Sequence, residues 1–143
     1  MTTKPSPRIA NYVNALPLRP GIRVLEIGCG PGAAAREVMR RIGEGKVVAI
    51  DRSAKAIKLA VDGSAAELAT GRLEYRKVAI EDFERERGEG QFDLAFAMRV
   101  GALDGRHPDA GRRAMRRLKA ALKPEGMLFI DASAPVSGKD IDA

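Results

Sequence analysis

The chain has 143 residues, of which 45% are hydrophobic and 31% are charged, and its formal net charge at pH 7 is +6. This length suits a single domain with one well-buried core, and no apolar run is long enough to cross a bilayer. The first residues lack the apolar stretch of a secretory signal and the chain has one cysteine, so we expect a cytoplasmic protein without disulfides or membrane contact.

Apolar strands alternate with helices along the chain. We predict helices over residues 8–16, 33–42, 54–68 and 108–122, and a short helix with a loop in 81–90. We predict strands over residues 22–27, 46–50, 73–79, 92–98 and 127–130. Ser53 is the expected N-cap of the third helix. A turn is expected at 123–126, and residues 133–143 are a small, polar tail that we expect to be partly disordered.

The predicted strands are nearly unbroken apolar runs, which is typical of a parallel sheet covered by helices on both faces. No internal repeat or second domain is visible, so we assign residues 1–143 to one α/β domain. In such sheets, ligands bind at the carboxyl ends of the strands, where the winding reverses direction. The residues at or just past such an end are Glu26, Gly28, Asp51, Ile80 and Met98.

Residues 24–32, with the sequence VLEIGCGPG, read as a buried strand that stops at three closely spaced glycines. Glycine adopts positive φ without a Cβ clash and lets a ligand approach the main chain. Because a helix follows directly, the turn of Gly28, Gly30 and Gly32 predicts a ligand seat built from backbone amides. Cys29 lies within this turn, where we interpret it as a small packed side chain rather than a nucleophile.

Spacing alone leaves two cofactor classes open for this turn. Gly28, Gly30 and Ala33 fit the nicotinamide pattern, and Asp51 lies where an acidic residue would hold ribose hydroxyls of any adenosine cofactor. Glu26 separates the two classes, because its carboxylate would repel a pyrophosphate and attract a cationic group. The glycine run is also shorter than a pyrophosphate loop needs. These features favour a cationic cofactor without a pyrophosphate.

The positive charge is concentrated in the predicted helix at 108–122 and the residue that follows it. Apolar residues keep helical spacing there, so the basic side chains would occupy the opposite, solvated face. No aromatic residues alternate with them as a stacking platform would require. These observations favour a solvated helix face, and nucleic acid stays open as an alternative partner. The basic residues are Arg112, Arg113, Arg116, Arg117, Lys119 and Lys123.

The sequence resembles the class I S-adenosylmethionine-dependent methyltransferases. Residues 24–32 are similar to the family's first motif, 47–51 to its second, and 92–98 to its fourth strand. Residues 118–130 are similar to its "LKPGG" turn and fifth strand, and the resemblance covers about 18–132. It implies a Rossmann-like, doubly wound sheet with the strand order 3-2-1-4-5.

The family usually continues past strand five through another helix and two further strands. This chain stops about a dozen residues after Ile130, so we expect those last two strands to be lacking. Strand five would then be an uncovered apolar edge, which proteins normally protect or pair. We therefore expect a homo-oligomer or a docked partner at this edge.

The resemblance implies that S-adenosylmethionine is the cofactor and gives it a set of contact residues; no metal is implied. Glu26 would contact the cofactor's amino group, and the glycine loop would pass beneath its methionine part and ribose. Asp51 would accept both ribose hydroxyls, and Arg52 would flank the adenine. The implied cofactor-binding residues are Glu26, Gly28, Cys29, Gly30, Gly32, Asp51, Arg52, Ile80, Glu81, Met98 and Arg99.

The remaining implied contacts lie at the ends of the third and fourth strands. The backbone near Ile80, with Glu81 or Asp82, would recognise the adenine edge, an assignment open by a residue or two. Met98 and Arg99 would meet cofactor and substrate, although Met98 fits core packing equally well.

These features predict a methyltransferase whose acceptor is unknown. No Asn-Pro-Pro-Tyr type sequence follows the fourth strand, which favours a small-molecule acceptor over adenine or glutamine nitrogen. No catalytic base is evident, and we interpret His107 as a surface residue. Two alternatives stay open: a catalytically inactive S-adenosylmethionine-binding subunit of a larger assembly, and an NAD-dependent oxidoreductase, which Glu26 disfavours.

Overall fold

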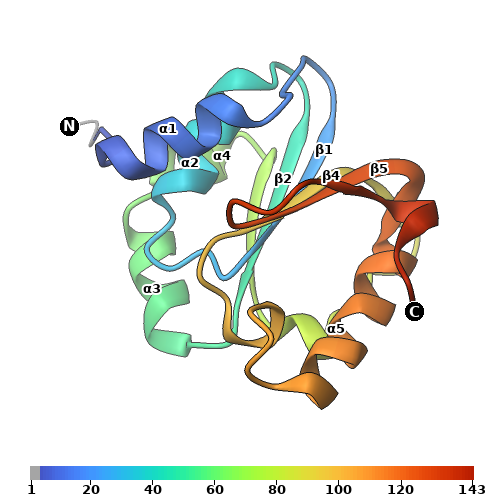
Figure 1. Ribbon diagram of the computed structural model, residues 1–143. Helices are drawn as coiled ribbons and strands as arrows, with labels where there is room; N and C mark the ends of the chain where they lie inside the picture. Colours follow the sequence, from blue (N-terminus) through green and yellow to red (C-terminus); the bar gives the residue numbers. More distant parts are fainter. Residues whose placement is uncertain (1–3) are drawn as a thin grey trace.

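The structure is a computed structural model that describes residues 4–143. Its centre is one six-stranded sheet with the order β3-β2-β1-β4-β5-β6, in which β1 to β5 are parallel and β6 is antiparallel to β5 (Figure 1). The predicted order 3-2-1-4-5 is therefore confirmed, with one strand added at the edge. The strands are β1 (Arg23–Ile27), β2 (Lys46–Asp51), β3 (Leu73–Lys77), β4 (Phe92–Ala97), β5 (Leu122–Ile130) and β6 (Val136–Ser137).

Helices cover both faces of this sheet, as the alternation of strands and helices predicted. Figure 1 shows α1 to α4 on one side of the sheet and α5 on the other. The helices are α1 (Pro7–Ala15), α2 (Ala33–Arg41), α3 (Ala54–Asp62), α4 (Ala65–Ala69) and α5 (Pro108–Ala121). Three short 3-10 turns complete the chain: η1 (Ile80–Asp82), η2 (Gly101–Leu103) and η3 (Gly138–Asp140).

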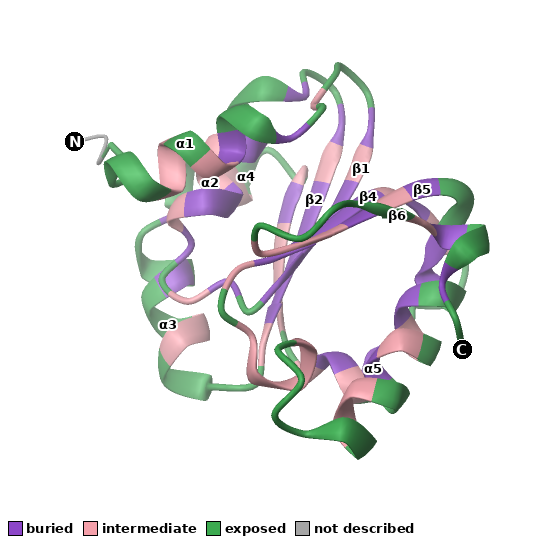
Figure 2. Cartoon of the chain, viewed as in Figure 1, coloured by how far each residue is buried: buried purple, intermediate pink, exposed green. Residues whose placement is uncertain are grey.

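Each face of the sheet has its own hydrophobic core. Side chains of a strand alternate between the faces, so Val24 of β1 packs with α1 and α2, whereas Leu25 packs with α5. Figure 2 shows the central strands buried along most of their length, and the outer helix surfaces exposed. None of the helices within residues 4–143 is long and apolar enough to cross a membrane.

The helix expected at 54–68 is two helices, α3 and α4. Ser53 is the N-cap, as predicted, and its Oγ accepts from the Ala56 amide at 3.1 Å. The break comes at Ser64, whose buried hydroxyl accepts from Arg36 at 3.0 Å and lies 2.9 Å from the Tyr75 hydroxyl. Serine side chains that bond elsewhere compete with a continuous helix.

The turn expected at 123–126 lies within β5. The pairing of β4 with β5 shifts register between Phe92 and Leu94, which are paired with Leu122 and Met127. This irregularity absorbs the residues between the two pairs as a bulge. The fifth strand therefore begins at Leu122, five residues before the predicted start.

The tail packs as part of the fold, so the expectation of a partly disordered tail is wrong, and part of the expected open edge at strand five is paired. After β5 the chain turns back, and β6 pairs with Met127 and Leu128. Ile141 is only 2% exposed and packs into the core beneath α5. The Lys119 ammonium donates to the Ile141 carbonyl at 2.7 Å. β6 thus pairs with two of the four residues that were expected to form the open edge, and a homo-oligomer or partner there stays a prediction.

The basic face of α5 is largely engaged within the chain. Arg113 pairs with Asp82 at 2.6 Å, and Arg117 pairs with Glu84 at 2.8 Å, so two arginines tie α5 to the η1 segment. Arg112 pairs with Asp109, and Lys123 with Asp93. Exposed pairs of this kind add at most about 1 kcal/mol each. They nevertheless pair four of the six basic residues on which the possibility of a nucleic-acid partner was based.

Replacing Ile141 by alanine tests whether the tail belongs to the core. Removing a fully buried isoleucine leaves a cavity, so we expect Ile141→Ala to lower the free energy of unfolding by about 2–4 kcal/mol. Val136→Ala is the control, because Val136 of β6 is 36% exposed and should cost less than about 1 kcal/mol. Urea denaturation measures both. Equal, small losses would contradict the packing of the tail.

Candidate functional site

The turn after β1 has the conformation that its glycines predicted. Gly28, Gly30 and Gly32 have φ of 73°, 51° and 90°, all in the left-handed region that side chains disfavour. A Cβ at Gly28 would collide with Val100, and one at Gly32 with the Tyr75 hydroxyl. Gly30 has no neighbour within 4 Å of that position, so its outer face is open.

Backbone hydrogen bonds fasten this loop to the end of β2. The amides of Gly28 and Cys29 both donate to the Ile50 carbonyl, at 2.8 and 2.9 Å. Cys29 is 5% exposed, and burial raises the pKa of its thiol well above the ordinary value. A buried neutral thiol packs as a small apolar group, in agreement with the interpretation made from the sequence.

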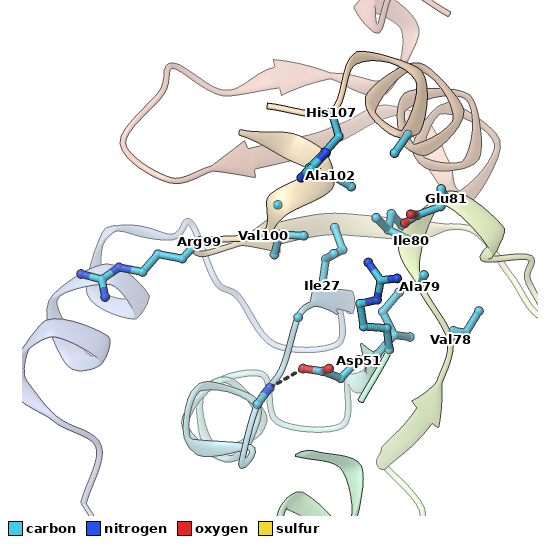
Figure 3. A pocket seen from close by; sticks show the side chains of 16 residues that line it. Ile27, Asp51, Val78, Ala79, Ile80, Glu81, Arg99, Val100, Ala102 and His107 are labelled. Atoms are coloured by element: carbon cyan, nitrogen blue, oxygen red, sulfur yellow. Dashed lines mark hydrogen bonds between the residues drawn. The ribbon is translucent and has the colours of Figure 1, made fainter. Parts of the chain in front are cut away.

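Asp51 is the last residue of β2, and its carboxylate joins two backbone turns. Oδ2 accepts from the Gly30 amide at 3.0 Å and Oδ1 accepts from the Ser53 amide at 2.9 Å. Figure 3 shows the bond between the carboxylate and the loop. Each carboxylate oxygen has a further lone pair, so both remain able to accept from a ligand. Asp51 therefore supports the glycine loop as well as the start of α3, and it has acceptor capacity left over.

Glu26 is a buried carboxyl group with incomplete hydrogen bonding. It is only 5% exposed, and its Oε1 has no hydrogen-bond partner among residues 4–143. Burial is the main cause that raises the pKa of Glu26 to about 8; the charge of Asp51 adds to the shift and that of Arg36 opposes it. A buried, unpartnered acid is costly for a fold and is a common property of functional sites.

A cavity of about 440 Å³ opens at the carboxyl ends of β1 and β2. The structure brings seven of the eleven predicted residues into its wall, while the other four lie outside it. The seven are Gly28, Gly30, Asp51, Arg52, Ile80, Glu81 and Arg99. The four are Glu26, Cys29, Gly32 and Met98. In Figure 3 the side chain of Arg99 points away from the other labelled residues, so this arginine lines the cavity through its backbone end.

Much of the wall is apolar and was not predicted from the sequence. Ile27 and Ile50 precede predicted site residues, so the strand-end rule could have found them. The segment from Val100 to Ala102 follows β4 and enters η2, and no local sequence pattern determines its path. His107 is exposed, as expected, but its ring lies at the edge of this cavity (Figure 3). The unpredicted lining residues are Ile27, Ile50, Val78, Ala79, Val100, Gly101, Ala102, His107 and Ala110.

Within residues 4–143, no group of three or more His, Cys, Asp and Glu side chains is arranged to hold a metal ion. The cavity wall offers a glycine turn, a strand-end aspartate and an apolar floor, and the unpartnered buried Glu26 lies outside that wall near the end of β1. On a sheet of this order, these features define a Rossmann-like protein whose pocket suits an adenosine-bearing ligand.

Comparison with known proteins places the chain in one family. Residues 24–126 match the methyltransferase domain family, and the chain belongs to it, as the resemblance to class I methyltransferases predicted. A ubiquinone biosynthesis O-methyltransferase of Xanthomonas campestris pv. campestris (strain B100) is 34% identical over 120 residues, which are 84% of this chain and 46% of that protein. The corresponding protein of Xanthomonas oryzae pv. oryzae (strain PXO99A) is 36% identical over 121 residues, with the same two coverages. The chain thus spans about half the length of these relatives.

Solved structures share the fold. An S-adenosylmethionine-dependent methyltransferase from Thiobacillus denitrificans, in complex with S-adenosyl-L-homocysteine, superimposes with a TM-score of 0.68 at 21% identity, covering 91% of this chain and 50% of that one. The 4+2 cyclase SpnF superimposes with a TM-score of 0.69 at 28% identity, covering 86% and 43%. At 21% identity, the likeness to the Thiobacillus protein concerns the fold alone. SpnF is named a cyclase, so one fold serves different reactions.

The buried acid predicts an unusual pH dependence of stability. The folded protein keeps the Glu26 proton up to about pH 8, whereas an ordinary carboxyl loses it at about 4.5. The folded state therefore binds more protons between these values, and the free energy of unfolding falls as pH rises through them.

Glu26→Gln cannot titrate and isolates this effect. We expect the variant to gain stability over the wild type by about 2 kcal/mol or more between about pH 5 and pH 8. Urea unfolding at a series of pH values measures the difference. A difference that stays constant over this range would contradict the raised pKa.

Proposed function

We propose that this chain is an S-adenosylmethionine-dependent methyltransferase domain that transfers a methyl group to a hydroxyl oxygen of a small molecule. The observation that carries the cofactor assignment is the unpartnered Oε1 of Glu26, buried at the end of β1 beside a glycine loop. The oxygen acceptor is supported by the O-methyltransferase names of the relatives from Xanthomonas.

The residues present fit the cofactor group by group. The Glu26 carboxyl suits the cationic amino group of the methionine part, and the open face of Gly30 leaves room for close approach to the main chain. Asp51 has acceptor capacity left for the ribose hydroxyls. Ile80 and Val100 supply an apolar surface for the adenine in the same cavity. A pyrophosphate supplies no cation that could ionise and pair with Glu26, which argues against NAD.

S-adenosylmethionine supplies a methyl group already activated on a sulfonium, so the protein mainly has to bind and align the reactants. The apolar floor of the cavity excludes water from the adenosine side. A cation beside Glu26 favours the ionised carboxylate and lowers its raised pKa. We therefore expect cofactor binding near pH 7 to release the Glu26 proton.

Calorimetry with S-adenosylmethionine, S-adenosylhomocysteine and NAD tests the cofactor. We expect the first two to bind and NAD to give no heat. A folded sample without affinity for S-adenosylmethionine would rule the proposal out.

Methyl transfer needs a second experiment. The protein is incubated with methyl-labelled cofactor and cell extract, which is then separated into low-molecular-weight, protein and nucleic-acid fractions. Label in the first fraction supports a small-molecule acceptor. Cofactor binding without any transferred label would favour an inactive binding subunit or a different reaction, as the structural likeness to SpnF illustrates.

Asp51→Ala tests the ribose contact. Losing charge-assisted hydrogen bonds to the ribose should weaken S-adenosylhomocysteine binding by more than about 1 kcal/mol. Calorimetry measures this affinity, and urea denaturation shows whether the variant is folded. Asp62→Ala is the matched control, because Asp62 is exposed, pairs with Lys58 and lies outside the cavity wall. An unchanged affinity in Asp51→Ala would restrict this residue to supporting the loop.

A further inference from the structure

Two residues without the freedom of glycine adopt left-handed backbone conformations. They are Arg99, with φ 57°, and Asp131, with φ 47°, and within residues 4–143 no other non-glycine residue has positive φ. Arg99 follows β4 shortly after its end, and Asp131 is the first residue after β5. Such conformations cost energy and persist only where surrounding contacts hold them. They follow two adjacent strands, at the end of the sheet that carries the cavity.

One direct hydrogen bond joins these two residues, and a second ties Asp131 to β4. The Arg99 amide donates to Oδ1 of Asp131 at 2.7 Å, and the Asp131 amide donates to the Ala97 carbonyl at 2.9 Å. The Tyr12 hydroxyl of α1 also donates to the Ala97 carbonyl, at 3.3 Å. Burial, with the charges of Asp131 and Glu26, raises the pKa of Tyr12 to about 12, so this hydroxyl remains a donor. The ends of β4 and β5 are thus held together through Asp131.

The segment that Asp131 holds forms one side of the cavity. Residues 99–102 all line it, whereas Asp131 does not. Val100 lies so close to the glycine loop that a Cβ built on Gly28 would be 2.7 Å from its Cγ2. The distance between this segment and the glycine loop sets the width of the cavity. A shift of the Arg99 backbone would therefore change the space available to a ligand.

We propose that Asp131 is a positioning residue for cofactor binding. It acts through the backbone of Arg99. Its carboxylate holds the Arg99 amide, and thereby keeps residues 99–102 in the wall of the cavity. Aspartate and asparagine enter the left-handed region more readily than other side chains, so Asp131 supplies both the conformation and the acceptor. Arginine has no such preference, and its conformation depends on the bond. This proposal rests on the proposed function for the identity of the ligand.

Three substitutions of Asp131 separate the conformation from the hydrogen bond. Asp131→Asn keeps an oxygen acceptor and tolerates positive φ. Asp131→Gly tolerates positive φ but has no acceptor, and Asp131→Ala has neither. Asp140→Gly is the matched control, because Asp140 lies in η3 and its carboxylate accepts from Ser137, outside the cavity wall.

Calorimetry with S-adenosylhomocysteine and hydrogen exchange of the amides of residues 99–102 give the readouts. We expect a Kd within about threefold of the wild type for Asp131→Asn, and a Kd raised about tenfold for Asp131→Gly and Asp131→Ala. The Arg99 amide should exchange faster in the last two variants. Asp140→Gly should change neither quantity.

The outcomes distinguish this proposal from the proposed function. If the wild type binds S-adenosylhomocysteine and Asp131→Gly binds it equally well, Asp131 is not a positioning residue, while the cofactor assignment stands. Unchanged exchange of the Arg99 amide in Asp131→Gly would overturn the proposal even without a binding measurement. A wild type that does not bind S-adenosylhomocysteine would overturn the proposed function and, with it, the cofactor role of Asp131.

Discussion

Parallel pairing of β1 with β2 is the constraint on which the site depends. In this register Ile27 lies beside Ile50, so the glycine turn emerges next to the end of β2. The Ile50 carbonyl and the Asp51 carboxylate then accept the first amides of the turn. Without these acceptors, the buried part of the loop would have unsatisfied amides. The same pairing therefore shapes the loop and places Asp51 at the edge of the cavity.

The protonation state of Glu26 depends mainly on its burial. Glu26 lies on the face of the sheet that packs against α1 and α2, where water cannot solvate an ionised carboxylate. Its neighbour Asp51 adds a like charge, so the Glu26 proton is retained until a cation approaches. In the proposed function, the cationic amino group of the cofactor would complete the hydrogen bonding of Glu26 that the fold leaves unsatisfied. The electrostatics thus favour a cationic ligand over a phosphate.

The ends of β4 and β5 are held by residues that follow β5 in the chain. Asp131 after β5 fixes the Arg99 backbone after β4, and β6 and η3 cover the edge of β5 with the tail. The Ile141 side chain anchors that tail beneath α5. The wall of the cavity is therefore supported by residues that do not touch it, which is how a scaffold keeps a site rigid.

The first four strands, most helix bounds, the glycine turn and the strand-end position of Asp51 could be predicted from the amino-acid sequence, because these depend on local spacing and conformational preference. Strand order followed from family resemblance, since periodicity contains no information about which strands pair. The remaining features depend on contacts between distant parts of the chain. The Arg99–Asp131 bond joins residues 32 apart, and the Tyr12–Ala97 bond joins residues 85 apart. The unpartnered state of Glu26, the pairing of β6 and the approach of Val100 to Gly28 likewise arise from packing between segments distant in the chain, which no local pattern specifies.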